Sequence, residues 1–288
     1  MMVVADSGST KTHWAATGRD GVCRLSTEGL NPLHLSEAAL GAELRRVAEW
    51  IGRVGAGADA PLDVYFYGAG CGTADAVQRM RRALTQALPA GAHVEVESDL
   101  LGACRALCGD APGWVGILGT GANACRYDGR HVACRPLSLG YLLGDEGSGC
   151  YIGKRLLTDY LRRTMPEGLR GPFADCLGMD YGEVMQRLYR RPAPNRFLAS
   201  LAPFAAAHRD EDYVRQLLTY AFEAFLCHLV GGLDEPPTCL SFVGSIAHVF
   251  ADELRQVCGA HGVEVATIVK EPLPALVDYH LRHASQRD

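Results

Sequence analysis

Short apolar runs alternate with glycine-containing turns at the start of the chain. This pattern predicts strands over 3–5, 12–17 and 22–27, a turn at Gly8 and a hairpin turn at Arg19-Asp20-Gly21. Consecutive short strands joined by tight turns pair in antiparallel order. The chain is therefore expected to open with an antiparallel meander.

Helical and strand-like patterns alternate over residues 36–108. Ser36 and Thr73 each precede a segment in which apolar residues recur every three or four positions, which is typical of a capped amphipathic helix. Pro89 and Gly91 end the second of these segments. The predicted elements are, in chain order, a helix from Ser36 to Val54, a strand over 64–67, a helix from Thr73 to Leu88, a strand over 93–97 and a helix over 100–108.

The opening pattern recurs after a break at residues 109–113 that is rich in Gly and Pro. Two modules that begin with the same glycine-turned meander indicate a duplicated fold, with a domain boundary at this break. The second module is predicted to hold strands over 114–118, 122–127 and 131–135, a helix from about Tyr151, a mainly helical stretch over 180–231, a strand over 239–243, a helix from Ser245 through Val257, a strand over 263–269 and a closing helix over 274–283.

The composition is that of an ordinary globular protein. The chain has 288 residues, 48% of them hydrophobic, and a formal net charge of -5. This length suggests two domains, and the absence of a basic excess argues against nucleic acid as a partner. Cysteines without a C-x-x-C pair indicate reduced thiols in a cytoplasmic protein. The acid at Asp6 precedes any signal-peptide core, and no uncharged apolar window is long enough for a membrane span, so we expect neither secretion nor membrane insertion.

A polar turn with the sequence Asp6-Ser7-Gly8-Ser9-Thr10-Lys11-Thr12 joins the first two predicted strands. Small residues allow the backbone N–H groups of such a turn to converge on a phosphate, and Asp6 could hold a hydrated Mg²⁺. A solvent-facing hairpin of ordinary turn-forming residues explains the same segment. Taken alone, this segment fits the second explanation better.

The second meander carries a similar turn, Gly119-Thr120-Gly121-Ala122-Asn123-Ala124. Its G-x-G-x-x-A spacing matches a dinucleotide-binding fingerprint, which requires a helix immediately after the turn. A strand and a hairpin follow instead, so a nicotinamide cofactor is excluded, and no Walker-type phosphate loop occurs. Two hairpin tips from two domains could together hold one triphosphate.

Several further polar positions allow both a functional and a structural explanation. Asp99 stands between a strand and a helix, where open α/β sheets place their chemistry, but Asp is also a common helix N-cap. Asp145 and Glu146 lie in a glycine-rich turn that also fits the start of a capped helix, and Asn31-Pro32 fits an Asx-type turn. Gly244-Ser245 either lets a flat ligand approach the backbone or closes a tight turn.

Five segments in a fixed order carry a more specific pattern than any one of them. They are VVADSGSTKT at 3–12, ESDLLGA at 97–103, ILGTGAN at 117–123, LGDEGSG at 143–149 and FVGSIA at 242–247. In this order they resemble the BadF/BadG-type ATPase family, in the branch similar to N-acetylglucosamine kinase. The resemblance covers nearly the whole chain. It implies an α/β fold of two actin-like (ribonuclease H-like) domains, each a mixed five-stranded sheet with flanking helices, around a nucleotide cleft.

The resemblance also implies domain limits and residue roles. The domains would span 1–111 and 112–272, and the closing helix over 273–288 would pack back on the first domain and act in the hinge. Asp99 would be the general base that takes a proton from a sugar hydroxyl as it attacks the γ-phosphate of ATP, and Asp6 would contact Mg²⁺ through water. The other implied assignments are the first phosphate loop at Asp6, Gly8, Ser9, Thr10 and Lys11, the second phosphate loop at Gly119, Thr120 and Gly121, the adenosine motif at Gly244 and Ser245, and the sugar-binding groups at Asn31, Asn123 and Asp145.

The activity implied by the resemblance is phosphorylation of an amino sugar with ATP and Mg²⁺. The expected substrate is an N-acetylhexosamine such as N-acetylglucosamine, phosphorylated at its 6-hydroxyl. The resemblance is also compatible with a homodimer. Two alternatives stay open: a BadF-type ATPase whose cycle drives a partner protein, and a non-catalytic sugar sensor.

The sequence departs from related proteins in two respects, one of which concerns the sugar and the other the metal. The segment 136–141 lacks the glycine and tryptophan that acetylglucosamine kinases carry before a conserved glycine, which leaves the sugar's identity open. No cysteine arrangement matches the iron–sulfur site of the family's dehydratase activators or the zinc motif of another sugar-kinase branch. We therefore expect no metal other than Mg²⁺.

Overall fold

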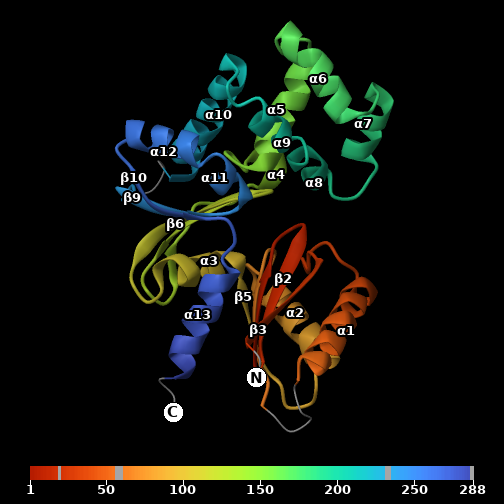
Figure 1. Ribbon diagram of the computed structural model, residues 1–288, viewed down its shortest axis with the longest axis vertical. Helices are drawn as coiled ribbons and strands as arrows, with labels where there is room; N and C mark the ends of the chain where they lie inside the picture. Colours follow the sequence, from red (N-terminus) through yellow and green to blue (C-terminus); the bar gives the residue numbers. More distant parts are fainter. Residues whose placement is uncertain (19–20, 56–60, 231–234, 286–288) are drawn as a thin grey trace. The chain divides into compact units, whose positions relative to one another are not determined.

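The computed structural model describes residues 1–18, 21–55, 61–230 and 235–285 (Figure 1). Arg19 and Asp20 of the predicted hairpin turn, and Gly231 of the predicted helical stretch, lie outside these described residues. The chain forms two compact units. The first comprises Met1–Ala111 together with Pro272–Asp288, and the second comprises Pro112–Glu271.

The first unit is built on five strands: β1 (Met2–Ser7), β2 (Lys11–Gly18), β3 (Gly21–Glu28), β4 (Asp63–Gly68) and β5 (His93–Ser98). They form one mixed sheet in the order β3-β2-β1-β4-β5. The predicted meander makes its antiparallel half, because β2 pairs antiparallel with both β1 and β3. Strands β1, β4 and β5 run parallel and make the other half.

Four helices cover this sheet: α1 (Glu37–Val54), α2 (Ala74–Ala87), α3 (Asp99–Cys108) and α13 (Leu273–Ala284). Successive side chains of a strand point to opposite faces. Val3 and Ala5 of β1 therefore pack in the core that α1 and α2 cover, whereas Met2 and Val4 pack with Leu276 of α13. Figure 1 shows α1 and α13 on opposite sides of the sheet. The last helix of the chain thus belongs to the first unit.

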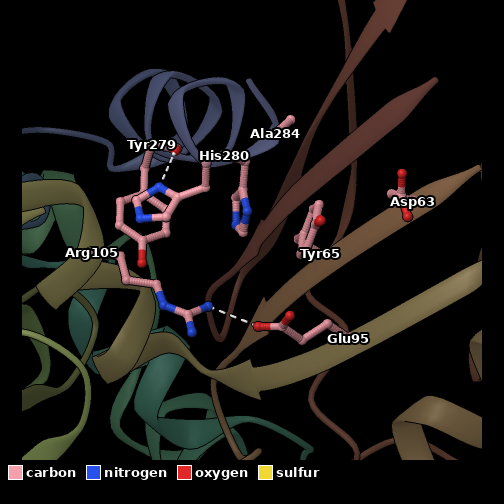
Figure 2. Close-up of a pocket in the computed structure, with 8 residues that line it drawn as sticks. Asp63, Tyr65, Glu95, Arg105, Tyr279, His280 and Ala284 are labelled. Atoms are coloured by element: carbon pink, nitrogen blue, oxygen red, sulfur yellow. Dashed lines mark hydrogen bonds and ion pairs between the residues drawn. The ribbon is translucent and has the colours of Figure 1, made fainter. Parts of the chain in front are cut away.

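The C-terminal half of α13 borders a cavity of about 290 Å³ beside β4 and β5. Figure 2 shows Tyr279 and His280 projecting from α13 toward this cavity, with Arg105 of α3 and Glu95 of β5 across it. The guanidinium of Arg105 donates from Nη1 to Glu95 Oε1 at 2.8 Å. On α13 itself, Nε2 of His280 lies 2.8 Å from the hydroxyl oxygen of Tyr67, and Nε2 of His283 lies 3.1 Å from Asp110 Oδ1. Polar groups therefore hold the end of α13, while apolar residues hold its beginning.

The second unit repeats the same sheet. Its strands are β6 (Gly113–Leu118), β7 (Ala122–Tyr127), β8 (Val132–Cys134), β9 (Cys239–Val243) and β10 (Glu264–Val269). They lie in the order β10-β9-β6-β7-β8, which is the order of the first sheet with β6 to β10 in the places of β1 to β5. The duplicated fold, the α/β class and the two mixed five-stranded sheets with flanking helices are confirmed.

Helices form most of the remainder of the second unit, and one predicted helix is wrong in its extent. The segment 245–257 is not continuous, because Phe250 leaves the helical region at φ -109°, ψ 37° and buries its ring near Phe222.

Among the described residues, no helix combines the length and the apolar character that a membrane crossing requires. The helices are α4 (Gly140–Leu143), α5 (Gly149–Leu161), α6 (Glu167–Leu177), α7 (Tyr181–Tyr189), α8 (Pro194–Ala199), α9 (Ala202–Ala207), α10 (Asp212–Ala224), the π-helical η1 (Phe225–Val230), α11 (Ser245–Val249) and α12 (Ala251–Ala260).

Candidate active site

The parallel strands of the first unit end together at one edge of the sheet. Ser7 of β1 pairs with Gly68 of β4, and Gly68 pairs with Ser98 of β5. Neighbouring strands lie about 4.8 Å apart, so the turn after β1 and the residue after β5 are on the order of 10 Å apart. The candidate phosphate turn and Asp99 therefore share the edge where open α/β sheets commonly bind ligands.

The turn after β1 is shaped by Gly29, a residue to which no sequence pattern points. The N–H of Gly8 donates to Lys11 O at 2.9 Å, and the N–H of Gly29 donates to Thr10 O at 3.0 Å. A Cβ atom on Gly29 would lie 2.6 Å from Gly8 O and 2.7 Å from Ser9 O. These two carbonyls thus face Gly29.

The orientation of these carbonyls fixes the orientation of the next amides. A trans peptide directs its C=O and its N–H to opposite sides. The N–H groups of Ser9 and Thr10 therefore point away from Gly29. Successive amides with this common direction form the kind of concavity that binds anions. Ser9 is half-buried, and Thr10 and Lys11 are exposed.

Two buried hydroxyls hold the base of this turn. Ser7 Oγ and Thr12 Oγ1 lie 2.8 Å apart, and the N–H of Leu30 donates to both, at 3.1 and 3.2 Å. Thr12 also donates to Glu28 O at 3.0 Å. Because their hydroxyls are engaged within the fold, Ser7 and Thr12 position the turn. Asp6 is half-buried one residue before the end of β1.

The helix-capping explanation for Asp99 is wrong, because Ser98 is the N-cap of α3. Ser98 Oγ accepts from the N–H of Leu101 at 3.2 Å. Asp99 is the first residue of α3, and its Oδ1 accepts from the N–H of Leu100 at 2.9 Å. Burial raises the pKa of Asp99 to about 6, against the opposing effect of backbone N–H groups. A carboxyl group with a pKa this close to neutrality suits a general base.

The position of Asp99 follows from close packing of α3 on β4. A Cβ atom on Gly102 would lie 2.9 Å from the side chain of Tyr67, so α3 packs directly over that ring.

The thiol of Cys71 is buried near Asp99. Its burial, together with the negative charges of Asp99 and Glu97, raises the pKa of Cys71 to about 12. Cys71 is therefore a neutral neighbour of Asp99.

Asn31 reaches the same edge of the first sheet. Its side chain is buried, and its Oδ1 accepts from the N–H of Leu33 at 2.9 Å, which confirms the Asx-type turn. A Cβ atom on Gly70 would lie 2.3 Å from Asn31 Oδ1. Because Gly70 lies only two residues after the end of β4 at Gly68, the amide of Asn31 lies near the carboxyl end of that strand.

The second turn, Gly119-Thr120-Gly121, is organised as the first one is. Its carbonyls again face their own unit: the N–H of Gly149 donates to Gly119 O at 2.8 Å, and the N–H of Cys150 donates to Thr120 O at 3.1 Å. The amides of Thr120 and Gly121 therefore point away from the start of α5. Both turns thus present consecutive N–H groups.

Gly244 packs directly on the strand that leads to the second turn. It has φ +127°, which side chains with a Cβ rarely adopt, and a Cβ there would lie 2.2 Å from Leu118 O. Its N–H donates to Val269 O at 3.0 Å. Ser245 is exposed as the first residue of α11. The segment 244–245 is thus held against the backbone at Leu118.

Asp145 lies over the second turn in a left-handed conformation, with φ 59°. Its Oδ1 accepts from the N–H of Ala122 at 3.2 Å, and its Oδ2 lies 2.9 Å from where a Cβ of Gly121 would be. Burial raises the pKa of Asp145, and the charge of Glu146 adds to this effect. Asn123 is next on β7, and its Oδ1 accepts from the N–H of Ala124 at 2.9 Å. A strained non-glycine residue beside a candidate site is a common functional feature.

The predicted residues form two groups, one in each unit. No sequence signal pointed to Gly29 or Gly70, because each is needed only where another segment approaches it. Within the described residues, no group of three or more His, Cys, Asp or Glu side chains could hold a metal ion by itself. A single carboxylate such as Asp6 suits Mg²⁺, which is held mainly by substrate phosphates and water. The groups are the turn 8–11, Asp6, Asn31 and Asp99 in the first unit, and the turn 119–121, Asn123, Asp145, Gly244 and Ser245 in the second.

Several solved structures resemble the whole chain. A protein of Porphyromonas gingivalis is 38% identical over 97% of this chain and 98% of its own, with a TM-score of 0.89. A protein of Chromobacterium violaceum is 20% identical over 96% of this chain and 98% of its own, with a TM-score of 0.70. Both are described as a "Putative N-acetylglucosamine Kinase".

A ROK family glucokinase of Streptomyces griseus, solved with glucose and AMPPNP, shares the fold. Its TM-score is 0.57 at 16% identity, over 96% of this chain and 97% of its own. No protein-family model and no curated protein matches the chain. The resemblance to the BadF/BadG family therefore stays a prediction.

Proposed function

The chain belongs to the same family as the Porphyromonas gingivalis protein, and from that premise we propose that it is an ATP-dependent sugar kinase acting on an N-acetylhexosamine. N-Acetylglucosamine, phosphorylated at its 6-hydroxyl, is the proposed substrate. The descriptions of the two relatives support the substrate class.

The observation that carries this proposal is the state of Asp99. Its carboxyl group does not cap α3, burial raises its pKa to about 6, and it stands at the same sheet edge as the turn after β1. At neutral pH such a group is mostly ionised and yet basic enough to accept a proton. We assign Asp99 the role of general base, which accepts the proton of the sugar hydroxyl. As that proton moves to the carboxylate, the sugar oxygen forms a bond to the γ-phosphorus and the bond to the ADP oxygen breaks.

The two turns would supply donors for the phosphates of ATP. Consecutive amides at Ser9 and Thr10, and at Thr120 and Gly121, have the common direction that suits phosphate oxygens. Lys11 would add a positive charge. Bound Mg²⁺ would neutralise phosphate charge, with Asp6 as its protein contact through water.

The remaining residues would bind the two substrates without taking part in the proton transfer. Asn31, Asn123 and Asp145 offer amide and carboxylate groups for sugar hydroxyls and for the acetamido group. Gly244 and Ser245 would lie against the adenosine. Position rather than covalent chemistry dominates phosphoryl transfer, so each of these contacts would contribute chiefly by orienting the reactants.

The test is ADP release from Mg-ATP with N-acetylglucosamine, N-acetylmuramic acid, N-acetylmannosamine, glucosamine, glucose or no sugar. We expect one acetylated sugar to raise the rate far above the sugar-free rate. Asp99→Asn should abolish this increase, whereas Asp75→Asn, an exposed acid in the first turn of α2, should not. A rate that is the same with and without every sugar would contradict the kinase proposal and would favour an ATPase that drives a partner protein.

A further inference from the structure

A single arginine joins α2 to the loop that carries Asn31. Arg79 donates from Nη1 to Pro32 O at 2.5 Å and from Nη2 to Leu35 O at 2.8 Å. The two carbonyls belong to the segment between β3 and α1, more than forty residues before Arg79 in the chain. The planar guanidinium presents its donors in a fixed fork, so one side chain can hold two acceptors at a fixed spacing.

The loop held by Arg79 is folded around Asn31. Asn31 O accepts from the N–H groups of His34 and Leu35, both at 3.2 Å, while its side-chain Oδ1 accepts from Leu33. The peptide unit between Pro32 and Leu33 links the two sets of contacts, because Arg79 holds its carbonyl while its N–H donates to Asn31 Oδ1. Gly70 closes the opposite side, where a Cβ would meet the amide at 2.3 Å.

Gly70 and Arg79 restrict Asn31 from two opposite sides. Gly70 limits how far the amide can move toward β4, and Arg79 limits how far the loop can move from α2. Hydrogen bonds from an ionised donor are stronger than neutral ones, so the Arg79 contacts hold the loop more firmly than an amide or hydroxyl would. A binding group must be held close to its productive geometry by residues behind it.

We propose that Arg79 is a positioning residue that keeps the loop over 31–35 in the conformation in which Asn31 binds the sugar. This inference rests on the proposed function, since Asn31 is there a sugar ligand. Arg79 acts through the loop and touches neither sugar nor nucleotide. Its loss should therefore weaken sugar binding while leaving ATP binding unchanged.

The kinetic test compares Arg79→Met, Arg79→Lys and Arg82→Met. Methionine keeps the apolar stem without the donors, and lysine can reach one carbonyl but not both. Arg82 is the matched control, because it is exposed on the same helix and donates within that helix, to Gln78 O. We expect Arg79→Met to raise the KM for the sugar about tenfold or more, with the KM for ATP unchanged, Arg79→Lys to lie between it and the wild type, and Arg82→Met to match the wild type.

A double-substitution cycle with Asn31→Ala separates positioning from general stability. If Arg79 acts through Asn31, Arg79→Met should add almost nothing to the sugar KM once Asn31 is alanine. If Arg79→Met raised the sugar KM by the same factor in the Asn31→Ala background as in the wild type, the proposal would be overturned. So would an increase in the KM for ATP as large as that for the sugar.

Hydrogen exchange gives a readout that does not depend on activity. In the absence of substrates, the amides of Leu33, His34 and Leu35 should exchange faster in Arg79→Met than in Arg82→Met. Unchanged exchange in this loop would overturn the proposal. Faster exchange in a protein whose wild type neither binds nor turns over any tested sugar would instead overturn the proposed function, and with it the role of this loop in sugar binding.

Discussion

Nε2 of His280 lies 2.8 Å from the hydroxyl oxygen of Tyr67, although 213 residues separate the two. The same oxygen accepts from Arg105 Nη1 at 2.6 Å. Burial raises the pKa of Tyr67, and Arg105 opposes this effect only in part, so the hydroxyl stays neutral. It can therefore accept from Arg105 and donate to His280. The hydroxyl of Tyr67 thus connects β4 with α13 and with α3, the helix that begins with Asp99.

Tyr67→Phe tests this connection. The substitution keeps the ring over Gly102 but removes two hydrogen bonds, one with His280 and one with Arg105. At about 0.5–1.5 kcal/mol each, their loss should lower the free energy of unfolding by about 1–3 kcal/mol. Urea denaturation followed by circular dichroism measures the loss. Tyr189→Phe is the control, because Tyr189 is 77% exposed. Equal stability of the two variants would show that the hydroxyl contributes nothing.

Asp99→Asn tests the general base through its pH dependence. Only the ionised carboxylate can accept a proton, so wild-type kcat should fall as the pH decreases through about 6, the pKa of Asp99. The variant should lose about 10² or more in kcat at pH 7.5 and show no such fall at lower pH. Steady-state rates from pH 5 to 8 decide this. Normal turnover in the variant would remove Asp99 from the chemistry.

The same carboxyl group should cost stability at neutral pH. Its pKa is about 6 in the folded chain and about 3.9 in the unfolded chain, so the folded chain binds more protons between these values. Its contribution to stability is then complete below about pH 4 and is lost as the pH rises through 6. Asp99→Asn should therefore melt at a higher temperature than the wild type at pH 7.5, and the difference should shrink toward pH 5. A lower melting temperature at pH 7.5 would contradict this reading.

Gly29→Ala should damage the first turn. The added methyl would meet Gly8 O and Ser9 O at 2.6 and 2.7 Å, so the turn must shift, at a cost of about 1–3 kcal/mol. We expect a higher KM for ATP, measured with saturating sugar. Gly52→Ala is the control: Gly52 lies in α1 with no atom within 4 Å of a built Cβ, so alanine should stabilise the helix by about 0.5–1 kcal/mol. An unchanged KM for ATP in Gly29→Ala would separate this turn from the nucleotide.

Gly244→Ala should weaken the second unit and its nucleotide contacts together. At φ +127° an alanine is strained, and its Cβ would collide with Leu118 O. We expect a loss of about 2 kcal/mol or more in stability and weaker binding of a fluorescent ATP analogue. Gly259→Ala in α12, where no atom lies within 4 Å of a built Cβ, should leave nucleotide binding unchanged and should not lower stability. Tight nucleotide binding by a stable Gly244→Ala protein would contradict the adenosine assignment.

Local patterns predicted most of the secondary structure. Ser36 and Thr73 cap their helices as expected, since an N-cap depends on a residue and the amides that directly follow it. The two meanders and their turns also follow from neighbouring residues. The cap of α3 is an instructive exception: both Ser98 and Asp99 are good caps, and sequence alone could not separate them.

The sequence by itself therefore determined most of the elements, the two glycine turns and the repetition that gives both sheets one strand order. Only the tertiary structure decided which glycines are indispensable and which polar groups support the site. Gly29 and Gly70 matter because distant backbone and side-chain atoms approach them, and Arg79 matters because its guanidinium reaches a loop on another element. Such contacts join residues far apart in the chain, so they depend on packing between elements, which no local pattern of side chains encodes.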